Sequence, residues 1–70
     1  MAEYVNNIKK CREDKNMTQA DLAESLGTNV RNVRRWENGE SSMDVITAMK
    51  IAKILNVKFE NLFEFDKEDI

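Results

Sequence analysis

The feature that most constrains this chain is Gly27, a single glycine between two short segments with helical spacing. Leu22 and Leu26 share one face of the first segment, and Val33 and Trp36 share one face of the second. Glycine adopts the left-handed conformation that ends a helix and turns the chain without steric cost. The pattern predicts two helices that cross closely at a very short turn.

The first of these two helices has the clearest start signal in the chain. Thr18 is a good N-cap residue, and Asp21 follows three positions later, as in a capping box. Met17 and Leu22 have the spacing of a hydrophobic staple around that cap. Ala23 is small enough to allow the second helix a close approach. These features are typical of a helix-turn-helix unit.

The other helices are predicted from weaker signals. A segment at about residues 5–15 places Val5, Ile8 and Cys11 on one face, with the charge of Arg12 in the same stripe. We expect Thr28 to cap the helix that contains Trp36. The Asn38-Gly39 pair should end that helix.

The C-terminal half predicts one core helix and one short helix. The core helix should run from an Asp44 cap to about Leu55, with Asn56 as a left-handed C-cap. A short helix is expected at Phe59–Phe63, and a short strand near residues 63–66 is possible, paired with Glu3-Tyr4-Val5. The wide apolar face of the core helix consists of Val45, Ala48, Met49, Ile51, Ala52 and Leu55.

Composition excludes most enzyme classes. The 70 residues include no histidine and a single cysteine, Cys11, so an imidazole-based catalytic centre, an intrachain disulfide and a zinc site are all excluded. Two glycines do not make a phosphate-binding loop. We therefore expect one domain over residues 1–70, with no metal, no cofactor and no enzymatic activity.

Charge is distributed unevenly along the chain. The formal net charge is −2, but residues 1–58 carry 10 basic and 8 acidic side chains, whereas residues 59–70 carry one lysine and five acids. An anionic partner should therefore avoid the acidic C-terminal end, residues 64–70. No apolar run approaches a membrane span and no signal peptide is visible, so a cytoplasmic location without membrane contact is expected.

The second helix of the pair has an unusual outward face. Arginine matches the edge of guanine, asparagine can pair with adenine, and valine can touch the thymine methyl group. The same side chains can instead hold phosphates or simply form a solvated surface. Seven consecutive positions contain Asn29, Val30, Arg31, Asn32, Arg34 and Arg35.

Several stretches of the sequence carry a resemblance to a known family. They are Thr18-Gln19-Ala20-Asp21-Leu22-Ala23, Leu26-Gly27, Val33, Arg35-Trp36-Glu37-Asn38-Gly39 and Lys50-Ile51-Ala52-Lys53-Ile54-Leu55-Asn56-Val57. Together they resemble the phage-repressor and Cro-type, or lambda-repressor-like, DNA-binding domain over about residues 6–63. The resemblance implies an all-α, compact five-helix bundle whose second and third helices form the helix-turn-helix, and homodimers that bind two half-sites.

The resemblance also implies roles for individual residues. The phosphate-binding glutamine of the family falls on Gln19, and a buried arginine–glutamate pair falls on Arg12 and Glu37. The dimer contact falls on the C-terminal segment, with Phe59, Leu62, Phe63 and Phe65. Base-reading positions fall on Asn29, Val30, Arg31 and Arg35, and further DNA contacts are expected at Thr28, Asn32, Arg34 and Asn38.

The sequence therefore predicts a sequence-specific transcriptional regulator that binds double-stranded DNA as a homodimer, with its third helix in the major groove. Repression is favoured over activation, because 70 residues leave no room for a ligand-sensing domain. The alternative is a protein-interaction module, such as an antitoxin-type regulator that binds a protein partner. The net negative charge and the acidic end favour that alternative.

Overall fold

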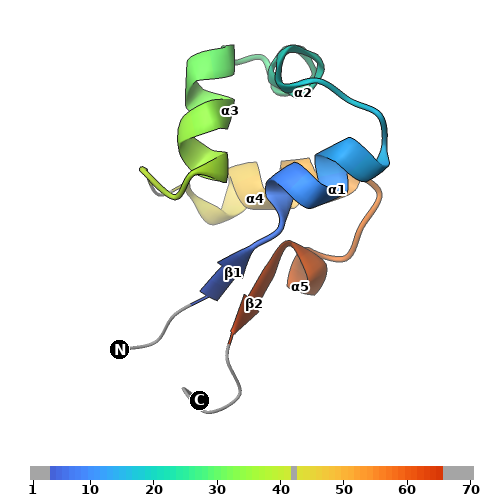
Figure 1. The fold of residues 1–70 in the computed structure, drawn as a ribbon, viewed down its shortest axis with the longest axis vertical. Helices are drawn as coiled ribbons and strands as arrows, with labels where there is room; N and C mark the ends of the chain where they lie inside the picture. The colour runs from blue at the N-terminus through green and yellow to red at the C-terminus, as the bar shows by residue number, and fades with distance from the viewer. Residues whose placement is uncertain (1–3, 42, 66–70) are drawn as a thin grey trace.

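The computed structural model describes residues 4–41 and 43–65 of the chain. Five helices and a two-stranded antiparallel sheet make up this part, which confirms the predicted helical class (Figure 1). No helix among these residues is both long enough and apolar enough to cross a membrane. The elements are β1 (Tyr4–Asn6), α1 (Ile8–Asp14), α2 (Gln19–Leu26), α3 (Val30–Glu37), α4 (Val45–Ile54), α5 (Phe59–Leu62) and β2 (Phe63–Phe65).

The ends of α2 form as predicted. The Thr18 hydroxyl accepts a hydrogen bond from the Asp21 N–H at 3.0 Å, and the Asp21 carboxylate accepts one from the Thr18 N–H at 2.9 Å. This reciprocal capping box satisfies two backbone donors that the helix leaves unpaired. Gly27 follows α2 with a φ of +72°, and the Thr28 N–H donates to the Ala23 carbonyl oxygen at 2.9 Å. The predicted turn between α2 and α3 is confirmed.

The cap of α3 differs from the prediction by one residue. Asn29, not Thr28, is the N-cap: its backbone is extended, and its Oδ1 accepts from the Asn32 N–H at 2.9 Å. Gly27 and Thr28 are used in the turn, so the last extended residue before the helix is Asn29. The predicted Asp44 cap of α4 is present, with Oδ1 accepting from the Thr47 N–H at 2.7 Å, and Asn56 is left-handed after α4 as expected.

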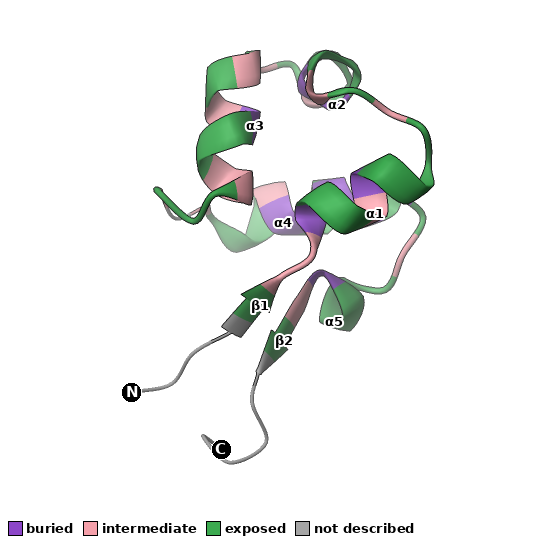
Figure 2. Ribbon diagram, viewed as in Figure 1, coloured by how far each residue is buried: buried purple, intermediate pink, exposed green. Residues whose placement is uncertain are grey.

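All five helices contribute to one hydrophobic core (Figure 2). Burial of a leucine, isoleucine or valine side chain contributes about 1.5–3 kcal/mol, so this cluster is the main stabilising feature of the fold. Trp36 and Cys11 are half-buried at its margin. The buried members are Ile8, Leu22, Ala23, Val33, Ile51, Ala52, Leu55 and Leu62.

Two predictions about apolar faces are wrong. The first helix begins at Ile8 rather than residue 5, and Val5 is an exposed residue of β1, because residues 4–6 pair with β2 instead of continuing the helix. On α4, Val45 and Met49 are 60% and 55% exposed. The face of α4 is wider than the core that the described part of the chain provides, so its outer edge stays uncovered.

The short terminal ribbon forms. Tyr4 pairs with Phe65, Val5 with Glu64 and Asn6 with Phe63 in an antiparallel register. Glu3 and residue 66 of the expected strands lie outside the described residues, as do residues 67–70 of the acidic end. The ribbon lies at the end of the molecule opposite α2 and the start of α3 (Figure 1).

Candidate nucleic-acid interface

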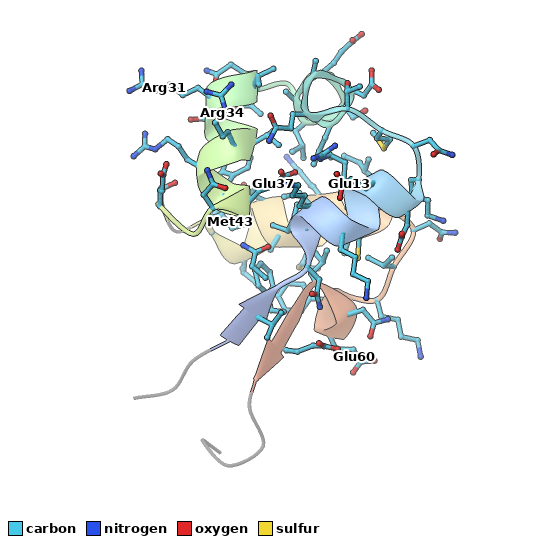
Figure 3. All side chains as sticks on the ribbon, viewed as in Figure 1. Glu13, Arg31, Arg34, Glu37, Met43 and Glu60 are labelled. Carbon is cyan, nitrogen blue, oxygen red and sulfur yellow. The ribbon has the colours of Figure 1, made fainter. Side chains whose placement is uncertain are left out.

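The outer face of α3 carries three exposed arginines, Arg31, Arg34 and Arg35. Figure 3 shows Arg31 extending outward near the start of α3 and Arg34 further along the same helix, while Glu60 lies at the opposite end of the molecule. Within residues 4–41 and 43–65, no carboxylate forms an ion pair with any of these three guanidinium groups. Their donors therefore face solvent.

The inner face of α3 holds the helix in this orientation. Val33 is completely buried and Trp36 packs against the same core. The Nδ2 group of Asn6 also donates to the Trp36 carbonyl oxygen at 2.7 Å, which links the end of α3 to β1. Trp36 is thus a packing residue, and the arginines lie on a helix whose inner face is anchored in the core.

The asparagines at the start of α3 are engaged in local hydrogen bonds. Oδ1 of Asn29 caps the helix, and Nδ2 of Asn32 donates to the Thr28 hydroxyl at 2.8 Å. Adenine recognition by asparagine uses both the amide oxygen and the amide nitrogen. With its oxygen occupied by the cap, exposed Asn29 offers mainly its NH₂ group to a partner. Val30 beside it is half-buried against the core.

Arg12 and Glu37 form the buried ion pair that the resemblance implied. Nε of Arg12 donates to Oε2 of Glu37 at 2.7 Å, and Nη2 of Arg12 donates to Oε1 at 3.3 Å. The two side chains are only 8% and 1% exposed, and Nη1 of Arg12 also donates to the Met17 carbonyl oxygen at 2.7 Å. The hydrogen bond that Arg12 donates to Glu37 raises the pKa of Arg12 against the opposing effect of burial. The pair joins α1 to the end of α3.

Gln19 has a partner that sequence reasoning missed. Its Nε2 donates to Oε1 of Glu37 at 3.0 Å, so the expected phosphate-binding side chain is tied to the buried pair. Figure 3 shows Glu37 between α3 and α1. No local spacing connects positions 19 and 37. The contact follows only from the packing of the start of α2 against the end of α3.

The expected dimer contacts do not share one environment. Phe59 is exposed and Phe63 is half-buried, with their ring centroids 6.0 Å apart. Leu62 is 0% exposed, so it belongs to the core and not to the monomer surface. The side chain of Phe65 lies outside the described residues. Phe59 and Phe63 line a groove of about 300 Å³ together with Val45, Met43 and Trp36.

The remaining expected contacts flank α3. Thr28 is half-buried at its start, and Asn38 is exposed at its end, one residue before the left-handed Gly39. The DNA-contact positions that the sequence predicted therefore lie along α3, at both of its ends and at the start of α2.

Comparison with known proteins agrees with this architecture. The helix-turn-helix family profile matches residues 8–62. An uncharacterised HTH-type transcriptional regulator of Archaeoglobus fulgidus is 36% identical over 63 residues, which is 90% of this chain and 89% of the relative. A second such regulator, from Methanocaldococcus jannaschii, is 34% identical over 64 residues, covering 91% of this chain and 97% of the relative.

A third relative has a different description. Multiprotein-bridging factor 1c of Arabidopsis thaliana is 37% identical over 57 residues, which is 81% of this chain but only 38% of the relative. The profile match and the near full-length likeness to two HTH-type regulators both agree with the capped α2, the left-handed Gly27 and the anchored α3. The chain therefore belongs to the Cro/C1-type, lambda-repressor-like helix-turn-helix family.

Proposed function

We propose that this protein is a sequence-specific, DNA-binding transcriptional regulator that places α3 in the major groove. The observation that carries the proposal is the exposed arginine face of α3, whose guanidinium groups have no carboxylate partner in the described part of the chain. A helix in the major groove reads base edges through such outward side chains. The anchored inner face of α3 keeps that surface in position.

Arg31 and Arg35 are the proposed base readers. They lie four residues apart and so share one face of the helix, and an arginine fork fits the two acceptors of guanine. Val30 is proposed to contact a thymine methyl group. Asn29 adds a hydrogen-bond donor, because its oxygen caps α3. We therefore expect each half-site to contain more guanines than adenines opposite α3.

The backbone of the duplex would be held by residues around this face. Gln19 at the first turn of α2 is proposed to contact a phosphate, where free backbone N–H groups also favour an anion. Asn32 and Arg34 are proposed to contact phosphates beside α3, with Thr28 and Asn38 at its two ends. Such contacts fix the register of the protein without reading sequence.

The protein is proposed to act as a homodimer through the face that contains Phe59 and Phe63. This face includes the groove next to them, and Val45 and Met49 extend it along α4. Exposed apolar side chains gathered around a groove are typical of protein contact surfaces. Leu62 is not part of the proposed dimer interface because it is buried, whereas Phe65 remains an expected dimer contact. The two half-sites would lie about one helical turn apart, roughly 34 Å.

Repression is the proposed outcome. In this proposal, a bound dimer represses by occupying its operator and so excluding RNA polymerase from that DNA. A reporter gene placed behind the selected operator should be transcribed less when the protein is present. Increased transcription would assign activation instead.

Selection of bound DNA from a random pool tests the proposal. We expect a pseudo-palindromic sequence whose half-sites are spaced by one helical turn, with guanine enriched opposite α3. Recovery of DNA with no sequence in common, at an affinity equal to that for random duplexes, would contradict the proposed function.

A second candidate function is supported by the apolar face of α4 and α5. Val45, Ile46 and Met49 are exposed there, and a protein-interaction module, such as an antitoxin-type regulator, would use such a face for a protein partner. The selection experiment separates the two functions, because an interaction module would enrich no sequence.

A further inference from the structure

We propose that Glu37 is a positioning residue that fixes Gln19 for contact with the DNA backbone. It would thereby couple the buried Arg12–Glu37 pair to the DNA-binding surface. This inference rests on the proposed function. It goes further because it assigns a binding role to a carboxylate that lies in the interior and touches no DNA itself.

The geometry around Glu37 supports the proposal. Its two oxygens accept three side-chain hydrogen bonds: Oε2 from Nε of Arg12 at 2.7 Å, and Oε1 from Nη2 of Arg12 at 3.3 Å and from Nε2 of Gln19 at 3.0 Å. The Glu37 side chain is 1% exposed, so water does not compete for these acceptor positions. Glu37 is in turn held by Arg12, which is itself tied to the Met17 carbonyl oxygen.

The amide of Gln19 has one donor left for a partner. A glutamine NH₂ group carries two N–H donors, and only one can point at Oε1 of Glu37. The second N–H is then directed away from the carboxylate. Gln19 is half-buried at the start of α2, the position proposed to face a phosphate. The side chain is therefore ordered before DNA arrives, and binding does not have to immobilise it.

The negative charge of Glu37 would by itself repel a DNA phosphate. This repulsion is offset by Arg12, whose guanidinium group neutralises the carboxylate through two hydrogen bonds. The acceptor that holds Gln19 thus brings little net negative charge to the interface. The arrangement uses α1, α2 and α3 together, so correct packing of these helices is a condition for the proposed phosphate contact.

The competing interpretation is purely structural: the hydrogen bond between Gln19 and Glu37 would join α2 to α3 and have no effect on binding beyond stability. Two charge-neutral double variants separate the interpretations. Both carry Arg12→Met, one with Glu37→Gln and the other with Glu37→Met. Neither has the ion pair, and only Glu37→Gln keeps an oxygen that can accept from Gln19.

The affinity of each double variant for the selected duplex is measured at a temperature at which circular dichroism shows it to be folded. We expect the Glu37→Gln form to bind about three- to tenfold more tightly, the range that one net hydrogen bond supplies. In a Gln19→Ala background this difference should disappear. Equal affinities with Gln19 present, or a difference that persists without it, would overturn the positioning role.

The wild-type protein is included in the same titration, so the two proposals fail differently. If the wild type binds no duplex in preference to random DNA, the proposed function is wrong and the positioning role falls with it. If the wild type binds selectively and the double variants bind equally, only the positioning role is wrong.

A second measurement needs no variant and no DNA. Relaxation of the Gln19 side-chain amide by NMR should show restricted motion in the free protein. An order parameter below about 0.6, which is typical of a flexible group, would contradict the proposal even if the double variants do not fold.

Discussion

Arg12 and the arginines of α3 have the same side-chain chemistry but lie in opposite environments. Arg12 is buried, and each of its three groups Nε, Nη1 and Nη2 donates to an oxygen of Glu37 or Met17. Arg31 and Arg35 are exposed and form no ion pair within the described residues. A buried charge must be paired, whereas an exposed guanidinium keeps its donors for a partner.

The comparison separates stability from recognition. Removal of Arg12 should destabilise the fold, because it leaves a buried carboxylate without its countercharge. Removal of Arg31 should leave the fold intact and change only what the surface binds. The two kinds of arginine should therefore respond differently to substitution.

Arg12→Ala should lower the free energy of unfolding by about 3–5 kcal/mol, because Glu37 would be left buried and uncompensated. For a domain of this size such a loss is a large share of the total stability. Urea denaturation followed by circular dichroism measures it. Arg34→Ala is the matched control, expected to change the stability by at most about 0.5 kcal/mol. Equal unfolding midpoints for both variants would contradict the buried role of Arg12.

Arg31→Ala should reduce affinity for the selected duplex by about 1–3 kcal/mol, and the loss should concentrate on one base position of the half-site. Its stability should stay within about 0.5 kcal/mol of wild type. Repeating the DNA selection with this variant shows which position is relaxed. A uniform loss of affinity across all sequences would instead assign Arg31 to phosphates.

Phe59→Ser should weaken the proposed dimer by roughly 1–2 kcal/mol, about five- to thirtyfold in the dissociation constant, by removing an exposed aromatic ring from the groove. Sedimentation at several concentrations measures this constant. Val5→Ser is the control: Val5 is exposed, but side chains alternate along a strand, and its neighbour Asn6 is the residue that lines the groove. If both variants weaken the dimer equally, the interface lies elsewhere.

The smallest expected effect is the acid sensitivity that comes from helix caps. Hydrogen bonds from backbone N–H groups hold the pKa of Asp21 and Asp44 below the usual value. Because the folded-state pKa is the lower one, this stabilisation is present above the ordinary aspartate pKa of about 3.9. It is lost as the pH falls through the folded-state value.

Asp44→Asn tests this prediction, because asparagine is also a good N-cap but does not titrate. Thermal melts between neutral pH and pH 2 should show a shallower loss of stability for the variant than for the wild type. Parallel pH profiles for the two proteins would show that the Asp44 cap does not contribute to the acid sensitivity.

Local signals predicted much of the fold. The capping box at Thr18 and the left-handed Gly27 depend on neighbouring residues only, and both are confirmed. The exposure of Val45 and Met49 was not predicted, because helical spacing identifies an apolar face but does not show which part a neighbour covers. The N-cap of α3 is Asn29 and not the predicted Thr28. The two residues have similar capping preferences, so the capping residue depends on the conformation of the preceding turn.

The sequence predicted which residues make up the candidate site, but not the hydrogen bonds that join them. The outward arginines follow from the spacing of Val33 and Trp36, which places the opposite face of α3 in solvent. The hydrogen bond from Gln19 to Glu37 joins positions 18 residues apart, and no periodic pattern relates them. Such contacts depend on how α2 and α3 pack, so they appear only in three dimensions.

The central claim is that the exposed face of α3 is the surface that meets DNA, while the apolar face of α4 and α5 meets protein. NMR titration of the isotope-labelled protein with the selected duplex tests it most directly. We predict that the largest changes in backbone amide chemical shift will occur at Gln19, at residues 28–35 and near Asn38. The chemical shifts of Val45, Met49 and Phe59 should change little. Shifts concentrated on α4 and α5 that leave Arg31 and Arg35 unaffected would contradict it.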